Sequence, residues 1–186
     1  MRAGSERPRA ASACRIYSWN LNGIRSAARK GLADWIRSSD AEIIGFQEVR
    51  AAVESVPPAI REIDDYHHHY VAAERKGYSG VGLVSRRKPD RLDTELGEPR
   101  FDSEGRIQIA RFGRLVIANG YFPNGSGKDR SNDRVPYKLD WYRALFERVE
   151  RWRRSGHRVL VMGDFNTAHR EIDLARPREN RKTSGF

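Results

Sequence analysis

The sequence has 186 residues, of which 38% are hydrophobic, and this size fits one domain or a large piece of one. Its 35 Lys and Arg residues exceed its 25 Asp and Glu residues, so the net charge is +10, which favours a polyanionic partner such as nucleic acid. The single cysteine, Cys14, excludes a disulfide framework, and no apolar run is long enough to predict a membrane span.

Residues 1–13 are rich in Arg, Ala and Ser and lack the apolar segment of a secretory signal. We expect them to form a disordered basic N-terminal arm. Regular patterns begin near Cys14, so we place the ordered domain at residues 14–186.

The first part of the domain alternates strand and helix patterns. Residues 14–20 (CRIYSWN) predict a strand, and residues 26–39 have the apolar spacing of a helix, weakened by Gly31 in its middle. Residues 41–49 are a short apolar run of strand type with the polar residues Gln47 and Glu48 near its end. This strand–helix–strand order indicates an α/β architecture.

The middle of the chain predicts consecutive strands. After a loop with a short helix at residues 51–65, two strands are expected at 66–74 and 78–85. Residues 106–112 and 114–122 predict a hairpin that turns at Gly113-Arg114. Residues 98–105 between these pairs are expected to be a loop. Consecutive hairpins make the sheet at least partly antiparallel, which excludes a doubly wound dinucleotide-binding fold.

The clearest helix is predicted at residues 137–154. One of its faces is apolar and consists of Leu139, Tyr142, Leu145, Phe146, Val149 and Trp152. The apolar run at residues 158–166 (RVLVMGDFN) then predicts a buried strand, and a polar tail follows Ala168.

Polar side chains recur where four of the predicted strands end. They are Asn20 and Asn22, Gln47 and Glu48, Asn119, Tyr121 and Asn124, and Asp164 and Asn166. Each asparagine taken alone is usual for a turn. A carboxylate directly after a buried strand is less usual, because Glu and Asp are seldom left at the edge of a core unpaired. Since ligand sites gather in the loops beyond strand ends, we expect these side chains to form one site.

Carboxylate and amide oxygens are the ligands that Mg²⁺ or Mn²⁺ prefers, and such sites leave positions for water and a substrate phosphate. A carboxylate can also orient or deprotonate the attacking water. No nucleophile elbow, phosphate-binding loop or dinucleotide fingerprint is present. Residues 67–69 are three histidines, but consecutive strand residues alternate faces and do not converge on one ion. The pattern therefore favours metal-assisted phosphodiester hydrolysis.

Six motifs strengthen this interpretation: SWNLNGIR, IIGFQEV, YSGVGLVS, EGRI, NGYFPNG and GDFNTAHREIDL. In their order and spacing they resemble the exonuclease III and apurinic/apyrimidinic endonuclease family, within the endonuclease/exonuclease/phosphatase superfamily. The resemblance covers residues 14–186 and implies a four-layer α/β/β/α sandwich with mixed sheets.

The resemblance also implies roles for single residues. Glu48 is expected to be the principal Mg²⁺ ligand, with Asn22 close to the metal. The implied catalytic residues are Asn20, Tyr121, Asp164 and Asn166. The implied DNA contacts are Arg50, Tyr78, Arg106 and Asn124.

The function implied by the resemblance is that of a Mg²⁺-dependent DNA phosphodiesterase of base-excision repair. It would act on double-stranded DNA, cleaving at abasic sites and trimming 3′ ends. We expect a monomer that does not bind membranes and lies in a bacterial cytoplasm near the nucleoid. Two alternatives stay open: a non-catalytic DNA-binding remnant, and a phosphoesterase of the same superfamily that acts on another phosphodiester.

Members of this family continue beyond the position that matches Phe186. That further segment carries more of the second sheet, an active-site Asp and a C-terminal Asp–His pair. We therefore expect residues 14–186 to be the N-terminal two-thirds of such a domain, with an incomplete second sheet. We also expect this chain to be weakly active or inactive, because the missing histidine would stabilise the transition state.

Overall fold

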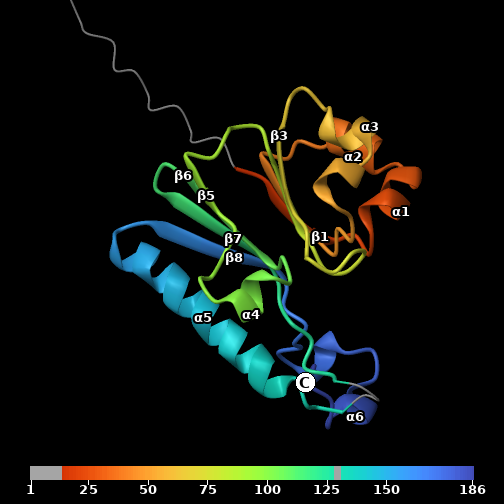
Figure 1. Cartoon of the computed structure of the whole chain (residues 1–186), viewed down its shortest axis with the longest axis vertical. Coiled ribbons are helices and arrows are strands. Elements are labelled where there is room, and N and C mark those ends of the chain that lie inside the picture. Colours follow the sequence, from red (N-terminus) through yellow and green to blue (C-terminus); the bar gives the residue numbers. More distant parts are fainter. Residues whose placement is uncertain (1–13, 128–130) are drawn as a thin grey trace, which may run out of the picture.

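The computed structural model of the protein describes residues 14–127 and 131–186, so the arm predicted at residues 1–13 lies outside the described residues. Two four-stranded sheets pack face to face, with strand orders β1-β2-β4-β3 and β5-β6-β7-β8. Helices α1, α2 and α3 cover the outer face of the first sheet, and α5 runs along the outer face of the second (Figure 1). This arrangement confirms the predicted α/β/β/α sandwich with mixed sheets.

The first sheet consists of β1 (Ile16–Asn20), β2 (Ile43–Gln47), β3 (His67–Val71) and β4 (Val81–Ser85), and the second of β5 (Arg91–Asp93), β6 (Ile107–Phe112), β7 (Leu115–Tyr121) and β8 (Arg158–Asp164). The α-helices are α1 (Ile24–Arg29), α2 (Leu32–Ser38), α3 (Pro58–Arg61), α4 (Pro99–Asp102), α5 (Val135–Arg154) and α6 (Pro177–Asn180). Two short 3₁₀ helices are η1 (Val53–Ser55) and η3 (Glu171–Asp173).

The strand directions bring the four polar strand ends together. β1 pairs with β2 in parallel, and β7 pairs with β8 in parallel, so the carboxyl ends within each pair lie side by side. The other pairs are antiparallel. β1 of the first sheet contacts β8 of the second, which places the ends of both parallel pairs at the same edge of the sandwich.

Most predicted elements are confirmed, with three differences. The helix expected at residues 26–39 is two helices, because Gly31 adopts the left-handed conformation (φ 92°) between α1 and α2. Helix α4 lies in the loop expected at residues 98–105, and the three-residue strand β5 was not predicted. Elements of three or four residues are too short to leave a periodic signal in the sequence.

The buried face of α5 overlaps the apolar face predicted from the sequence only in part, because it shares Leu145 and Val149 but is centred closer to Trp141. Trp141, Leu145 and Val149 are buried, whereas Leu139 is 56% exposed and Phe146 is 45% exposed. Trp141 packs edge-on against the buried ring of Phe122, at 4.8 Å between ring centroids. The sequence pattern could not show which of two partly overlapping apolar faces the sheet would cover.

Three buried amide side chains lie between the two sheets. Gln47 donates to Asn119 Oδ1 at 2.7 Å, and the amide nitrogen of Asn119 donates to the backbone oxygens of Gly82 (3.0 Å) and Phe46 (3.3 Å). Gln108 donates to the backbone oxygen of His69 at 2.9 Å. Gln47 and Asn119 therefore tie the sheets together rather than line the site, although the sequence places both at polar strand ends.

Among the described residues, no helix is both long and apolar enough to cross a lipid bilayer.

Candidate active site

The centre of the candidate site is a side-chain amide held between two carboxylates. Asn20, at the end of β1, donates through Nδ2 to Glu48 Oε1 at 2.9 Å and to Asp164 Oδ2 at 2.8 Å. Glu48 follows β2 of the first sheet, and Asp164 ends β8 of the second. The sandwich thus brings together two carboxylates from different sheets, and the amide between them offsets part of their mutual repulsion.

Two matching turns hold this arrangement. The backbone N–H of Asn22 donates to Asn20 Oδ1 at 3.0 Å, and the backbone N–H of Asn166 donates to Asp164 Oδ1 at 2.9 Å. Each is an Asx turn, in which a side chain accepts from the backbone two residues further on. The asparagine-rich ends of β1 and β8 therefore form turns, as their sequence suggests, and these turns also orient the polar groups of the site.

The site loops carry unusual backbone geometry. Five non-glycine residues among those described have a positive φ of 48–51°, and they are Asn22, Glu48, Arg50, Ser79 and Asn166. Backbone hydrogen bonds join the loops that contain them, from Gly23 N to Glu48 O (2.8 Å) and from Arg50 N to Ser79 O (2.8 Å). Left-handed residues other than glycine cost free energy, and they concentrate where function requires a fixed loop.

Tyr121 ends β7 beside these carboxylates. Burial, the negative charge of Glu48 and a hydrogen bond to it together raise the pKa of the Tyr121 phenol to about 12. The nearby Arg106 and Asp164 act in opposite directions on the same pKa. The phenol is therefore protonated near neutral pH and is available as a hydrogen-bond donor to an anion.

A glycine is required where β8 delivers Asp164. Gly163 has φ 136°, and a Cβ at this position would lie 1.9 Å from the backbone oxygen of Gly120 on β7. Any side chain here would push β8 away from β7 and move Asp164 with it.

The sequence pattern of the family described as the Endonuclease/Exonuclease/phosphatase family matches residues 17–185. The chain belongs to this family. Its curated relatives include the DNA repair nuclease APEX1 of Danio rerio, 34% identical over 177 residues, and the exodeoxyribonuclease of Bacillus subtilis, 32% identical over 173 residues. Each alignment covers 92% of this chain, but only 55% and 66% of the relative.

Solved structures agree on the fold. An AP endonuclease from Archaeoglobus fulgidus superposes with a TM-score of 0.77 at 24% identity, over 92% of this chain and 63% of the other. The catalytic domain of APE2 from Xenopus laevis superposes with a TM-score of 0.71 at 28% identity, over 84% of this chain and 60% of the other. The resemblance predicted from the motifs is confirmed, and the chain spans about half to two-thirds of the length of the proteins it matches.

The donor set fits a hard divalent cation of the kind expected in this family. Glu48 and Asp164 offer two carboxylates, and Mg²⁺ typically takes one or two from a protein while keeping waters and substrate oxygens. The second oxygen of Glu48 pairs with the exposed guanidinium of Arg50. Asn22 is exposed on the adjoining turn, so the predicted metal residues lie in neighbouring loops. No three His, Cys, Asp or Glu side chains gather at one point in the described part of the chain.

Asn166 and Asn124, two further predicted residues, are engaged with the protein. The side-chain amide of Asn166 donates to the backbone oxygen of Phe122 at 2.9 Å, so it braces the loop after β8 while its N–H orients Asp164. Asn124 is exposed, and its Oδ1 accepts from Ser126 N (2.9 Å) and Ser184 Oγ (3.1 Å).

The predicted DNA contacts differ in exposure. Arg50 is exposed, and Tyr78 is half-buried. Arg106 is only 3% exposed, and its guanidinium nitrogens bind Glu104, Tyr78 and the backbone oxygen of Tyr121. In this conformation Arg106 does not reach the surface, because the protein occupies its donors.

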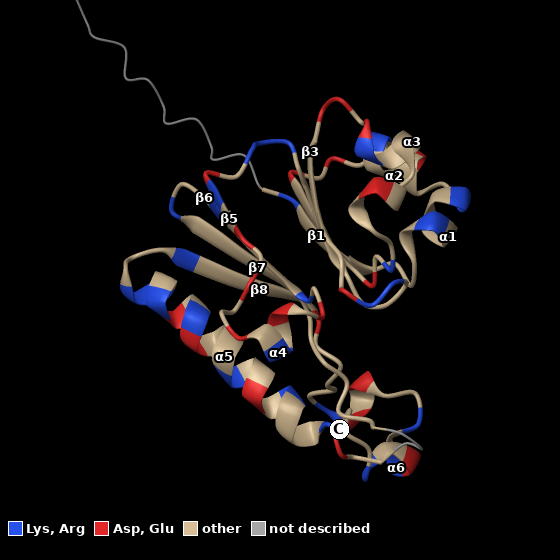
Figure 2. Cartoon of the chain, in the orientation of Figure 1, with Lys and Arg blue, Asp and Glu red and all other residues tan. Residues whose placement is uncertain are grey.

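Two grooves beside the carboxylates are rich in arginine. One is lined by Arg25, Arg29 and Arg50 together with Gly77, and the other continues it through Arg25 and Arg50 to Arg75, Lys76 and Tyr78. Arg25 and Arg29 were not predicted as site residues. Their separation of four positions, which places both on one side of a helix, was the only signal in the sequence. Elsewhere Lys and Arg alternate with Asp and Glu, as along α5 (Figure 2).

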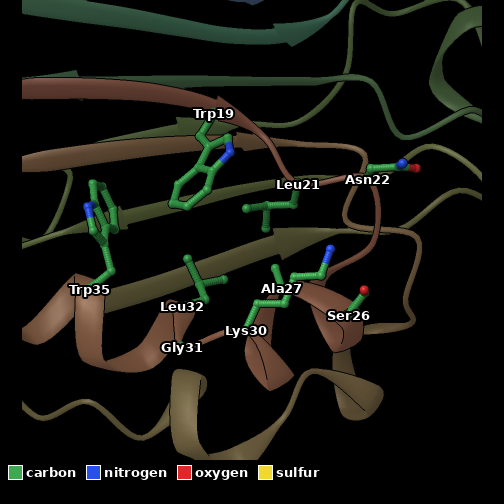
Figure 3. A pocket seen from close by; sticks show the side chains of 9 residues that line it. All are labelled: Trp19, Leu21, Asn22, Ser26, Ala27, Lys30, Gly31, Leu32 and Trp35. Atoms are coloured by element: carbon green, nitrogen blue, oxygen red, sulfur yellow. The ribbon is translucent and has the colours of Figure 1, made fainter.

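A separate pocket opens between β1 and the helices α1 and α2, with Asn22 at its rim (Figure 3). Trp19 and Trp35 meet there edge to face, with ring centroids 5.1 Å apart, and Leu21 and Leu32 complete the apolar lining. Its lining contains Lys30 but no carboxylate, so it adds nothing to the catalytic groups.

Lys138 is a buried residue of the site region that was not predicted. The residue is 4% exposed, and its ammonium group donates to the backbone oxygens of Asn166 (2.7 Å) and Ser184 (2.8 Å). Burial lowers the pKa of this amine, and the negative charge of Asp164 opposes that effect. Lys138 precedes Trp141 by three positions, so the two residues lie on the same side of α5. This spacing was the signal in the sequence that Lys138 is buried.

Proposed function

We propose that this protein is a Mg²⁺-dependent DNA phosphodiesterase of the exonuclease III and AP endonuclease type. It acts as a monomer on double-stranded DNA, cleaving at abasic sites and trimming 3′ ends in base-excision repair. The observation that carries the proposal is the Asn20 amide between Glu48 and Asp164, beside a protonated Tyr121. The family match and two relatives, one named as a DNA repair nuclease and the other as an exodeoxyribonuclease, support the choice of DNA as substrate.

Asp164 is the group that orients the attacking water and accepts its proton. Hydrogen bonds from Asn20 and from the N–H of Asn166 fix both of its oxygens, which favours a single orientation of the carboxylate. Tyr121 donates a hydrogen bond from its phenolic O–H to a non-bridging phosphate oxygen as negative charge develops there. When bound at Glu48, Mg²⁺ would polarise the phosphoryl group and neutralise part of that charge.

The arginine-lined grooves account for binding of the polyanion. Arg50 pairs with Glu48 and lines the first groove together with Arg25 and Arg29, so a DNA strand in this groove brings a phosphate close to the carboxylates. Contacts of this kind release counterions, and binding should therefore weaken steeply as salt rises.

A nicking assay tests the proposal. A labelled duplex with one abasic-site analogue and the matching intact duplex are incubated with the protein, in Mg²⁺ or in EDTA. We expect cleavage next to the lesion in Mg²⁺ only, and a loss of about 100-fold or more in Asp164→Asn. Asp34→Asn, which removes an exposed carboxylate on α2, is the control. Equal nicking in Mg²⁺ and EDTA would overturn the metal-dependent mechanism.

The same assay separates the alternatives. Salt-sensitive DNA binding without nicking would favour a non-catalytic DNA-binding protein. Hydrolysis of bis-p-nitrophenyl phosphate without nicking would favour another phosphodiester as substrate. The weak or absent activity expected from the sequence stays a prediction, and the nicking rate of the wild-type chain measures it.

A further inference from the structure

A cluster of charged side chains lies directly behind Tyr121. Arg106 occupies its centre and uses all three guanidinium nitrogens: Nε donates to Glu104, Nη1 to the backbone oxygen of Tyr121 (3.1 Å) and Nη2 to the Tyr78 hydroxyl (2.7 Å). It is 3% exposed, so these contacts replace water completely. A buried guanidinium with every nitrogen bonded to protein is a structural support rather than a ligand-binding group.

Arg106 holds Tyr121 from more than one direction. Its guanidinium carbon lies 4.7 Å from the centre of the Tyr121 ring, which is cation–π geometry. The backbone N–H of Tyr121 also donates to the backbone oxygen of Arg106 at 2.8 Å. The ring face and the backbone of Tyr121 are thus fixed against one residue, which determines where the phenolic oxygen points.

Glu104 and Arg134 in turn hold Arg106. One oxygen of Glu104 accepts from Arg106, and the other accepts from Arg134 Nη2 at 2.8 Å. Burial alone would raise the pKa of Glu104, but the two guanidinium groups outweigh that effect and hold the pKa below its usual value. Glu104 is therefore a carboxylate that bridges two cations at neutral pH.

Arg134 links this cluster to the long helix. It is the residue before α5, its guanidinium lies 4.7 Å from the centre of the Tyr137 ring, and it also donates to the Tyr78 hydroxyl at 3.4 Å. Without Glu104, two neighbouring guanidinium groups would lack their common anion, and Arg106 would lose the bond that fixes its plane.

We propose that Glu104 and Arg134 are positioning residues for Tyr121, acting through Arg106. The inference rests on the proposed function, in which Tyr121 donates to the phosphate. The phenolic oxygen must lie about 3 Å from the oxygen that gains charge, and displacement by about 1 Å costs on the order of 100-fold in rate. Arg106 accordingly supports the site from within and does not neutralise a DNA phosphate.

Single-turnover cleavage of the abasic duplex gives the first test. We expect Glu104→Gln to lower the maximal rate about 10- to 100-fold, with the half-saturating DNA concentration changed less than about twofold. Arg134→Gln should lower the rate in the same way, and the double variant should be no slower than Glu104→Gln alone. Glu150→Gln, which breaks an exposed ion pair with Arg153 on α5, should match wild type. Additive losses in the double variant would overturn the proposal.

The salt dependence of DNA binding, measured in EDTA, distinguishes positioning from direct contact. A lost phosphate contact lowers the slope of log K against log [salt] by about one. We expect the slope of Arg106→Gln to equal that of wild type, whereas Arg25→Gln, in the exposed groove, should reduce it. A reduced slope for Arg106→Gln would show that Arg106 binds DNA and would overturn the positioning role.

A readout independent of catalysis completes the test. In protein labelled with ¹³C at the tyrosine ring, the Tyr121 resonance is assigned by its loss in Tyr121→Phe. The Tyr121 resonance should shift in Glu104→Gln and Arg134→Gln and stay in place in Glu150→Gln. The resonance of Tyr66, which is buried between the first sheet and its helices, reports that the variants fold. An unshifted Tyr121 resonance in both variants would overturn the proposal. If wild type does not nick DNA, the proposed function fails, and the resonance still decides the positioning.

Discussion

The side-chain amide of Asn20 donates to Asp164 Oδ2 at 2.8 Å, although the two residues are 144 positions apart in the chain. The same nitrogen donates to Glu48 Oε1 at 2.9 Å. One amide therefore connects the ends of strands from both sheets. Asn20 and Glu48 lie on the first sheet and Asp164 on the second, so movement of one sheet relative to the other changes the Asn20–Asp164 distance. The packing of the sandwich therefore sets the geometry of the carboxylate pair.

Replacing Asn20 with Asp should disable the site without unfolding the protein. The substitution keeps the shape but places a third carboxylate between two others and removes the donor, so repulsion replaces attraction. We expect the rate of abasic-site cleavage to fall at least about 100-fold, and thermal stability in the absence of metal to fall. Mg²⁺ should restore more stability in the variant than in wild type, as measured by thermal unfolding with and without the ion.

Asn180→Asp is the matched control, because Asn180 is a partly exposed residue of α6 whose amide donates to the backbone oxygen of Arg176. Wild-type cleavage by Asn20→Asp would contradict the role assigned to the bridging amide.

Replacing Glu48 with Gln should weaken divalent-metal binding. The neutral amide is a poorer ligand than a carboxylate for a hard cation, so we expect the affinity for Mn²⁺ to fall about tenfold or more. Electron paramagnetic resonance of free Mn²⁺ measures this without any turnover. Glu42→Gln, an exposed position just before β2, should bind Mn²⁺ as wild type does. Equal Mn²⁺ affinities of wild type, Glu48→Gln and Glu42→Gln would show that Glu48 is not a metal ligand.

Gly163→Ala should destabilise the fold because of a steric clash. The added Cβ would lie 1.9 Å from Gly120 O, so β8 would have to separate from β7 at the pair formed by Gly120 and Gly163. We expect the free energy of unfolding in urea to fall by about 3 kcal/mol or more. Gly113→Ala controls for backbone strain, since Gly113 has φ 61° but no atom within 4 Å of the added Cβ, and should cost about 1 kcal/mol. Similar losses in both variants would refute the clash.

The histidines of β3 should make stability depend on pH. Burial lowers the pKa of His68 and of His69 below 6.5, and the neighbouring His67 adds to the effect on both. The unfolded chain therefore takes up protons more readily than the folded one as pH falls below 6.5, so stability should decrease from that pH down to the folded-state pKa values.

Urea unfolding at a series of pH values from 8 to 5 measures this dependence on pH. His69→Gln should flatten the decrease, whereas His169→Gln, at an exposed position, should leave it unchanged. An unchanged profile in His69→Gln would show that this ring does not contribute.

The sequence alone determined seven of the eight described strands and the main helix through their hydrophobic patterns, and it predicted the site through polar groups at four strand ends. Asn20, Glu48 and Asp164 could be named because each lies at the end of a predicted strand, and carboxylates are seldom left unpaired at the edge of a core. Their motifs, in order along the chain, also predicted the family, which the comparisons confirm.

Only the tertiary structure decided which of these polar residues meet. Gln47 and Asn119 look like site residues in the sequence but tie the sheets together, and Arg106 looks like a DNA contact but is buried behind Tyr121. The role proposed for Glu104 and Arg134 rests on the position of the Glu104 carboxylate between the guanidinium groups of Arg106 and Arg134. Such pairings depend on contacts between distant segments, and local periodicity reports which side of a strand or helix is apolar but not what lies opposite it.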